Sequence, residues 1–303
     1  MITSQYYEQA KLLTRIFDPV FTGTEFALRG GTAINFFFRN MPRYSVDLDL
    51  TYIKVAPRAE SLRAISEGLR SMSERIKRAL PGSEIEEYKG TDSNLVEKLY
   101  VYNDNTKIKI ETSTTIRGTI YSCEERPLCS KASEAFNAFA TARTLSFAEI
   151  YGSKICAALD RQHPRDIYDI MLLLKNEGIT ERVRKAFLVY LISHNRPIAE
   201  LLLPKLSDMK PSFENEFAGM ADDADYSELV VYREKLVKEI NEKLKTEEKL
   251  FLLSFKKGKP EWNLLGVAGV KDLPAVNWKL ENLNRMKKEK HEKAVEKLKQ
   301  VLE

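Results

Sequence analysis

The chain has 303 residues, of which 43% are hydrophobic and 30% are charged, and its formal net charge is +4. This length and composition allow a sizeable buried core, suggest about two domains and exclude wholesale disorder. The longest apolar runs are far shorter than the ~20 residues of a membrane-spanning helix, so no membrane partner is expected. The mild positive excess permits a polyanionic partner without requiring one.

The cysteines and the N-terminal residues indicate the compartment. Cys123, Cys129 and Cys156 are odd in number and lack metal-ligand spacing, which argues against a disulfide framework or a zinc site. Charged residues such as Glu8 and Lys11 interrupt any apolar N-terminal run, which argues against a signal peptide. We therefore expect a cytoplasmic protein.

The first predicted elements are a helix over residues 6–17, then a strand, a tight turn and a second helix. The turn, Gly30-Gly31-Thr32, lies between the apolar segments 26–28 and 33–38. Glycines at such a turn let backbone N–H groups approach a phosphate closely, and a helix N-terminus favours its negative charge. The hydroxyl of Thr32 is suited to contact a phosphate or to cap the helix.

The next predicted strand carries two carboxylates on one face. Val46, Leu48 and Leu50 alternate with Asp47 and Asp49, so the apolar side chains face a core and both carboxylates leave the other face together. Two anions at adjacent positions repel each other unless a cation lies between them. Mg²⁺ suits this position, because it takes one or two protein carboxylates and fills its other positions with water and substrate phosphates.

Each of these motifs has an ordinary structural explanation. A lone Gly-Gly is usually a turn, and a lone Asp-X-Asp is more often a solvated strand face than a metal site. Their occurrence in one strand-turn-helix-strand unit favours a functional interpretation. The combination predicts a metal-and-triphosphate site but does not name a reaction.

Further along, the pattern predicts a helix over residues 58–80 and a hairpin of strands 98–102 and 107–111. Such alternation indicates a mixed α/β sheet domain. If the second hairpin strand joins the Asp47/Asp49 strand, Glu111 lies on the same side as the two aspartates. Glu111 is then either a third carboxylate of the site or part of a polar face neutralised by Lys107 and Lys109, and the spacing leaves both possibilities open.

After about residue 143 the pattern becomes helical, so we divide the chain into residues 1–142 and 143–303. Ser146 and Glu149 form a capping-box signature at the start of a helix. Lys154 lies near the edge of that helix's apolar stripe. It is either an ordinary helix lysine or, beside a metal-and-triphosphate domain, a group that neutralises phosphate.

The following helix begins with Pro164 and carries Arg165, Asp166 and Asp169. The two aspartates are neighbours on one helical face, and Arg165 can pair with Asp169. Alone, this cluster would be a surface ion-pair set. Beside the predicted site, Asp166 or Asp169 can hold Arg165 and Lys154 in position.

The remainder of the chain is helical and charged. Residues 251–278 suggest a small packed subdomain. The excess of positive charge is local, because Arg285 to Gln300 contains seven lysines or arginines and three glutamates. Such a run is usually a solvated helix face, although it also suits contact with RNA or a partner protein.

Four separated blocks of the sequence together resemble the AbiEii/AbiGii family. The blocks are Phe26-Ala-Leu-Arg-Gly-Gly-Thr-Ala-Ile-Asn35, Arg43-Tyr-Ser-Val-Asp-Leu-Asp-Leu-Thr-Tyr52, Glu149-Ile-Tyr-Gly-Ser-Lys154 with Asp160 to Asp169, and the closing segments Pro260 to Leu265 and Leu273 to Leu280. Members of this family are nucleotidyltransferase-like toxins of bacterial toxin–antitoxin and abortive-infection systems. The resemblance covers most of the chain.

The resemblance implies a polymerase-β-like nucleotidyltransferase domain, with a mixed α/β sheet, followed by a mostly helical domain. On that pattern Gly31 and Thr32 match the glycine-hydroxyl motif, although Thr32 stands where this superfamily often has Ser. Asp47 and Asp49 match the metal-binding pair. Lys154 matches a lysine that contacts nucleotide phosphates, and Asp166 or Asp169 matches the later acidic residue.

The implied reaction is Mg²⁺-dependent transfer of a nucleotide from an NTP with release of pyrophosphate. Gly30, Gly31, Thr32 and Lys154 are expected to neutralise phosphate, supported by Arg165 and Asp169. Catalysis of this kind depends mainly on positioning and electrostatic stabilisation. Glu111 is our candidate for a further metal ligand or for a base.

The sequence says less about the molecule that accepts the nucleotide than about the NTP site. We expect RNA, and the 3′ end of tRNA in particular, with a cognate antitoxin as a further partner and a monomer as the favoured state. Two alternatives stay open: nucleotidylation of a protein hydroxyl, and a non-catalytic module that sequesters NTP or RNA.

Overall fold

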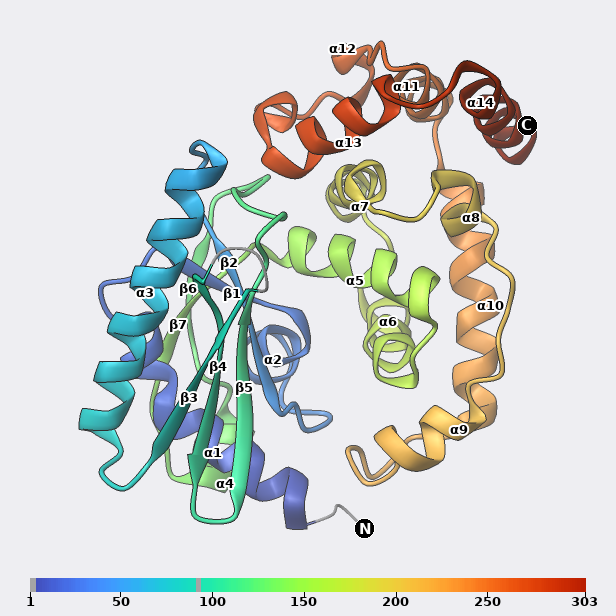
Figure 1. The fold of residues 1–303 in the computed structure, drawn as a ribbon. Coiled ribbons are helices and arrows are strands. Elements are labelled where there is room, and N and C mark those ends of the chain that lie inside the picture. Colours follow the sequence, from blue (N-terminus) through green and yellow to red (C-terminus); the bar gives the residue numbers. More distant parts are fainter. Residues whose placement is uncertain (1–3, 91–93) are drawn as a thin grey trace. The chain divides into compact units, whose positions relative to one another are not determined.

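The computed structural model describes residues 4–90 and 94–303. The chain divides into two compact units (Figure 1): Met1–Ser146 with Ala218–Asp223, and Phe147–Phe217 with Ala224–Glu303. The boundary that we expected after residue 142 falls inside a strand, Thr141–Thr144.

The first unit is built on a seven-stranded sheet. Its strands are β1 (Phe26–Arg29), β2 (Asp47–Tyr52), β3 (Glu84–Lys89), β4 (Val96–Asn103), β5 (Thr106–Thr112), β6 (Glu124–Pro127) and β7 (Thr141–Thr144), in the order β3-β4-β5-β2-β1-β7-β6. Its helices are α1 (Ser4–Phe21), α2 (Gly30–Ala33), the π-helical turn η1 (Ile34–Phe38), α3 (Arg58–Ala79) and α4 (Ser130–Phe136). β1 pairs antiparallel with β2 and parallel with β7, so the sheet is mixed, as predicted.

The core of the first unit lies on one face of this sheet. Leu48 and Leu50 of β2 and Ile108 and Ile110 of β5 are at most 1% exposed. Helix α3 packs over β4 and α1 packs over β5, and Figure 1 shows α3 running alongside the strands. The period-two alternation therefore leaves the polar residues of β2 and β5 on the opposite face.

Two of the predicted elements agree closely with the structure. The predicted helix over residues 58–80 is α3, and the predicted hairpin is β4 and β5, which pair from Lys98 with Glu111 to Asn103 with Thr106. Asp104 in the turn has a φ of 52°, a left-handed conformation that Asp tolerates.

The second unit is helical in its larger elements, which confirms the expected helical C-terminal part. The helices are α5 (Phe147–Arg161), α6 (Pro164–Asn176), α7 (Glu181–Ser193), α8 (Ile198–Leu202), α9 (Lys210–Ser212), η2 (Phe213–Phe217), α10 (Tyr226–Lys243), α11 (Thr246–Lys256), α12 (Trp262–Leu265), η3 (Val270–Asp272), α13 (Pro274–Asn284) and α14 (Lys288–Leu302). Within the part of the chain that the structure describes, no helix is both long enough and apolar enough to span a bilayer.

The starts of α5 and α6 follow from local sequence. α5 begins directly after Ser146, as its capping-box signature predicts. At α6, the side chain of His163 accepts a hydrogen bond from the backbone N–H of Arg165, and Pro164 occupies the first helical position, where its missing N–H costs nothing.

The segment Ala218–Asp223 belongs to the first unit although the residues on both sides of it belong to the second. The backbone N–H of Tyr44 donates to the carbonyl oxygen of Met220 at 2.8 Å, and Met220 is buried. This contact supports the segment that leads into β2.

The contact between α5 and α7 depends on a glycine. A methyl group at Gly152 would lie 2.6 Å from the backbone nitrogen of Phe187 and 2.8 Å from the Cβ of Ala186. Because both neighbours are fixed parts of α7, they cannot move aside without shifting the helix.

We expect Gly152→Ala to lower the free energy of unfolding by about 1–3 kcal/mol, because overpacking forces the two helices apart. Thermal melting of the purified protein measures the change. Ser153→Ala on the same helix is the matched control, since among the described residues the Ser153 hydroxyl donates to the carbonyl oxygen of Ile150 and to no other group. A Gly152→Ala protein as stable as the control would contradict the packing argument.

Candidate active site

The turn after β1 brings the backbone of Gly30 against a carboxylate. Gly30 has a φ of 74°, a region that glycine adopts without strain. A methyl group at this position would lie 2.5 Å from Oδ2 of Asp49. Strand pairing explains the proximity, because Arg29 of β1 lies opposite Asp49 of β2. Only glycine fits here without moving Asp49.

The backbone of Gly31 lies equally close to a guanidinium. A methyl group at Gly31 would lie 2.7 Å from an Nη atom of Arg43 and 3.1 Å from Oγ of Ser45. Arg43 is 4% exposed and donates to the carbonyl oxygen of Tyr44 at 2.8 Å. In the sequence, Arg43 and Ser45 were only members of a motif with no assigned role. In the structure, the side chains of both residues lie against the backbone of Gly31.

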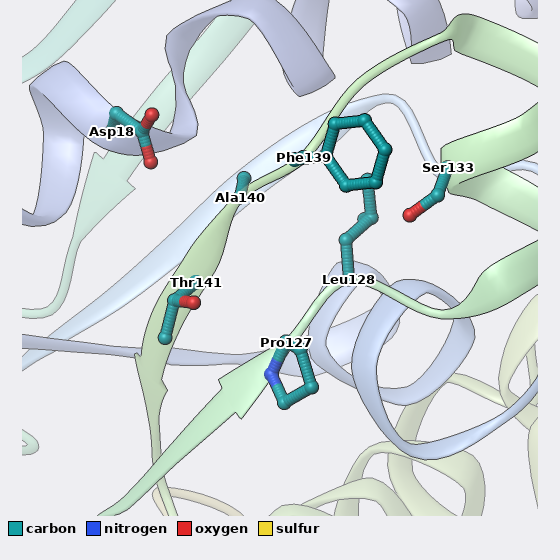
Figure 2. A pocket seen from close by; sticks show the side chains of 7 residues that line it. All are labelled: Asp18, Pro127, Leu128, Ser133, Phe139, Ala140 and Thr141. Carbon is teal, nitrogen blue, oxygen red and sulfur yellow. The ribbon is translucent and has the colours of Figure 1, made fainter.

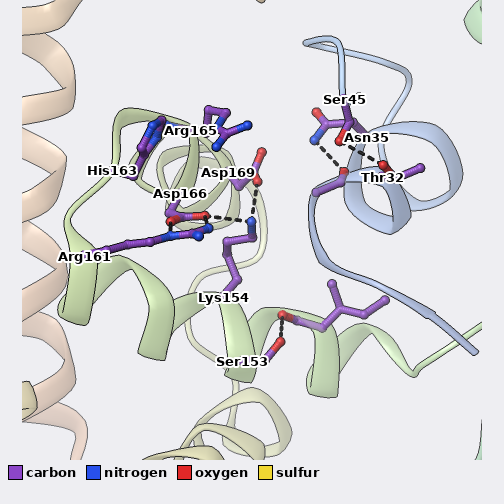
Figure 3. Close-up of polar contacts among 12 residues, drawn as sticks. Thr32, Asn35, Ser45, Ser153, Lys154, Arg161, His163, Arg165, Asp166 and Asp169 are labelled. Carbon is purple, nitrogen blue, oxygen red and sulfur yellow. Dashed lines mark hydrogen bonds and ion pairs between the residues drawn. The ribbon is translucent and has the colours of Figure 1, made fainter. Parts of the chain in front are cut away.

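Thr32 connects the turn to the start of β2. Its hydroxyl donates to the carbonyl oxygen of Asp47. It also lies 2.9 Å from Oγ of Ser45 (Figure 3). Thr32 is 1% exposed and lies inside α2, whose N-cap position is Arg29. The suggestion that Thr32 caps the helix is therefore wrong. Its hydroxyl contacts protein groups that hold Asp47 in position.

Asp47 and Asp49 leave the same face of β2, as predicted. Both are half-buried, whereas Leu48 between them is fully buried. β5 pairs with β2 in parallel, and this pairing places Lys109 opposite Asp47 and Glu111 opposite Asp49. The expectation that Glu111 shares the face of the two aspartates is therefore confirmed.

The carboxylate of Glu111 is occupied by two lysines. Nζ of Lys98 and Nζ of Lys109 each lie 2.7 Å from it. Burial alone would raise the pKa of Glu111, but the hydrogen bonds and charges of the two lysines outweigh burial and lower it. One alternative from the sequence was that Lys107 and Lys109 neutralise this face. Lys109 does so, whereas Lys107 lies over the ring of Tyr100, 4.0 Å from its centroid.

The residues present suit a magnesium ion at Asp47 and Asp49. Both carboxylates come from one strand face, and Gly30 leaves room beside Asp49 that a Cβ would fill. Mg²⁺ commonly takes two carboxylates and fills the rest of its shell with water and phosphate oxygens. Among residues 4–90 and 94–303, no group of three or more His, Cys, Asp or Glu side chains is arranged to hold a metal.

In the second unit, one lysine is shared by two buried aspartates. Nζ of Lys154 lies 2.9 Å from Oδ1 of Asp166 and 3.1 Å from Oδ2 of Asp169 (Figure 3). The side chain of Lys154 is 7% exposed, and both aspartate side chains are fully buried. The structure therefore brings these three predicted residues together, from α5 and α6.

The arginine of this cluster is Arg161, which the sequence did not indicate. Its Nε and Nη2 atoms donate to the two oxygens of Asp166 at 2.5 and 2.9 Å. The predicted partner, Arg165, makes no ion pair with Asp169 within 4.0 Å in the structure. Arg161 is the last residue of α5 and Asp166 lies in the first turn of α6, so the two residues meet across the corner between the helices and not through an i,i+4 spacing within one helix.

The charges around Asp166 keep it ionised. Its burial would raise the pKa, but the charge of Lys154 and the hydrogen bonds from Arg161 outweigh burial and hold the pKa well below its ordinary value. The cluster of Lys154, Arg161, Asp166 and Asp169 is therefore balanced in charge and ordered by its own contacts.

A pocket of about 420 Å³ lies elsewhere in the first unit (Figure 2). It contains no predicted site residue, and Phe139, which is 86% exposed, forms part of its rim. It is lined by Asp18, Pro127, Leu128, Ser133, Phe139, Ala140 and Thr141.

The comparison with protein families agrees with this geometry. A family model described as nucleotidyl transferase AbiEii toxin, type IV toxin–antitoxin system, matches residues 11–281. The chain belongs to this family. It is therefore a nucleotidyltransferase, and membership implies an NTP substrate and a cognate antitoxin.

A solved structure supports the same fold. The chain is similar to MenT4, a nucleotidyltransferase toxin from Mycobacterium tuberculosis H37Rv, with 15% sequence identity and a TM-score of 0.63. The match covers 93% of this chain and 95% of that one. At this identity the likeness concerns the fold. No curated protein sequence matches the chain.

We expect Thr32→Val to reduce the rate of nucleotide transfer by about 10- to 100-fold, because the start of β2 loses the bond that positions Asp47. Thr32→Ser keeps a hydroxyl and should retain most of the rate. Initial rates and melting temperatures of both variants provide the measurement. A valine variant that transfers as fast as the serine variant would show that the bond does not position Asp47.

We expect Asp166→Asn to destabilise the protein by about 3 kcal/mol at neutral pH, because Lys154 and Arg161 lose a buried partner. The pKa of Asp166 is lower in the folded protein than its ordinary value of 3.8. Its contribution to the free energy of unfolding is therefore complete above pH 3.8 and is lost as the pH falls below that value. The difference between wild type and variant should therefore shrink below about pH 4.

Chemical denaturation at pH 7 and at pH 3 to 4 measures this difference. Asp272→Asn, an exposed position in the same unit, is the matched control. A constant difference across this pH range would contradict the assignment of the charged pair.

Proposed function

We propose that this protein transfers a nucleotide from an NTP to an RNA acceptor, that the 3′ end of tRNA is the site of transfer, and that the transfer blocks translation in the cytoplasm. The observation that carries the proposal is the close packing of the glycine turn against Asp49. It joins a phosphate-binding backbone to a carboxylate pair.

The donor half of the reaction lies in the first unit. Asp47 and Asp49 would hold Mg²⁺, which supplies positive charge to the phosphates of the NTP. The backbone N–H groups of the Gly30-Gly31 turn are suited to bind phosphate oxygens, because glycine has no side chain of its own to keep a phosphate away from the backbone. Thr32 fixes the carbonyl of Asp47 and thereby keeps the turn and the carboxylates in register.

The chemistry is an in-line displacement at the α-phosphorus. The oxygen of the acceptor hydroxyl forms a bond to this phosphorus, the bond to the bridging oxygen breaks, and pyrophosphate leaves. The hydroxyl proton needs an acceptor. Glu111 is our candidate for this proton acceptor, because it lies opposite Asp49 in the sheet and its lysine partners keep it ionised.

Lys154 has the chemistry for the phosphate-binding role that the family pattern implies. An ammonium group has three N–H donors, and Asp166 and Asp169 accept from it, so one donor is available to a phosphate oxygen. The two aspartates and Arg161 hold the lysine in position. Arg165 lies on α6 with the two aspartates, makes no ion pair within 4.0 Å among the described residues, and is a further candidate for anion contact.

The charge distribution supports RNA as the acceptor. Positive charge is concentrated toward the end of the chain, where phosphate contacts with lysines and arginines would supply affinity that does not depend on sequence. A protein acceptor would need no such excess.

The test is transfer of labelled nucleotide to total cellular RNA and protein in one reaction, with each NTP and Mg²⁺ in turn. We expect label in the tRNA band, with a preference for one or two of the nucleotides. Asp47→Asn should reduce transfer by on the order of 100-fold or more. Asp104→Asn makes the same chemical change at an exposed turn and should transfer normally.

Label in protein bands alone would replace RNA with a protein hydroxyl as acceptor. Absence of any label, while expression of the wild type and of Asp47→Asn stops growth equally, would overturn the enzymatic account.

A further inference from the structure

Lys256 and Lys279 of the second unit lie near the ends of α11 and α7, close enough for the charge of one to act on the other, and away from the Lys154 cluster in sequence. Lys279 of α13 donates from Nζ to the carbonyl oxygens of His194 and Asn195 at 2.5 and 3.1 Å. These carbonyls follow α7 directly, so Lys279 places a positive charge at the negative end of that helix. Two of its three donors are used.

The charge of Lys256 acts on Lys279, but no carbonyl oxygens at a helix end explain why Lys256 itself is buried. It is the last residue of α11 and is 6% exposed. Its carbonyl oxygen lies 2.6 Å from Nε2 of His291, and the following Gly258 packs against Asn284 at the end of α13. The turn after α11 is thus held against the helix that carries Lys279.

Neither ammonium group has a carboxylate counter-ion in the part of the chain that the structure describes. Among the described residues, no carboxylate lies within 4.0 Å of Lys256 or Lys279. Burial lowers the pKa of Lys256, and burial together with the charge of Lys256 lowers the pKa of Lys279 to about 8. Removing an ammonium from water without a partner is costly, so an anion bound here would relieve both groups.

We propose that Lys256 and Lys279 form a binding site for a backbone phosphate of the RNA acceptor. The site rests on the proposed function for the identity of its ligand. Lysine binds phosphate as a compact charge with several donors. Lys279 keeps one donor, and the ammonium of Lys256 donates to no acceptor among the described residues. The α7 carbonyls fix Lys279, so its ammonium is ordered before the ligand arrives.

The charge of the sequence that carries the two lysines favours RNA over a small anion. Between Lys256 and Gln300 there are twelve lysines or arginines and six acidic residues, an excess of six positive charges, whereas the whole chain has an excess of four. A free phosphate needs only the two lysines. An extended polyanion also uses the charge around them.

Binding of bulk deacylated tRNA to the full chain, without NTP, tests the site. We expect Lys256→Met to weaken binding about tenfold and to reduce the slope of log K against log salt by about one. Lys271→Met removes an exposed lysine of the same region and should change binding far less.

Thermal melting without RNA separates a binding role from a structural one. If Lys256 serves to bind an anion, its buried charge destabilises the protein when no anion is bound. Lys256→Met removes that charge and should melt at the wild-type temperature or above. Weaker tRNA binding with a lower melting temperature would assign Lys256 a structural role and overturn the proposal.

Three other results would also overturn the proposal. The first is an unchanged tRNA affinity and salt slope in Lys256→Met, and the second is an equal loss of tRNA affinity in Lys271→Met. The third is a Lys256→Met protein that binds tripolyphosphate more weakly but binds tRNA as the wild type does. The assay measures binding alone. A failure to label RNA therefore overturns the proposed function and not this site, whereas labelled RNA with normal binding by Lys256→Met overturns this site alone.

Discussion

The backbone of Gly30 and Gly31 lies so close to the Asp49 carboxylate and the Arg43 guanidinium that no side chain fits between them. This contact fixes the turn against β2, and the pairing of Arg29 with Asp49 and the bond from Thr32 to Asp47 support it on either side. A glycine turn suited to bind phosphate and a carboxylate pair are thereby held together. The donor half of a nucleotidyltransferase needs this combination, because its catalysis depends on positioning and charge.

Lysines and carboxylates pair in opposite ratios in the two units. On the sheet, Lys98 and Lys109 share the single carboxylate of Glu111, whereas in the second unit Asp166 and Asp169 share the single ammonium of Lys154. The first arrangement keeps Glu111 ionised and lowers its basicity. The second leaves a lysine that is ordered and still has a donor to offer. Each lysine is therefore held by contacts within its own unit.

The sequence predicted those features that depend on short-range periodicity. The alternation around Asp47 and Asp49, the hairpin that carries Glu111 and the start of α5 all follow from neighbouring residues. Arg161 was missed because its bond to Asp166 crosses a corner between helices, and Arg165 was preferred because i,i+4 spacing is visible in a sequence. Likewise, no local pattern shows that Thr32 is buried or that Gly30 contacts Asp49.

The central claim is that the Gly30-Gly31 turn and the aspartate pair form one site for metal and nucleotide. Titration of Mn²⁺ by electron paramagnetic resonance, with a non-hydrolysable NTP present, tests it directly. The account predicts nucleotide-dependent Mn²⁺ binding in the wild type, and its loss in both Asp49→Asn and Gly30→Ala, because an added methyl group displaces the Asp49 carboxylate. Wild-type Mn²⁺ and nucleotide binding by a folded Gly30→Ala protein would contradict it.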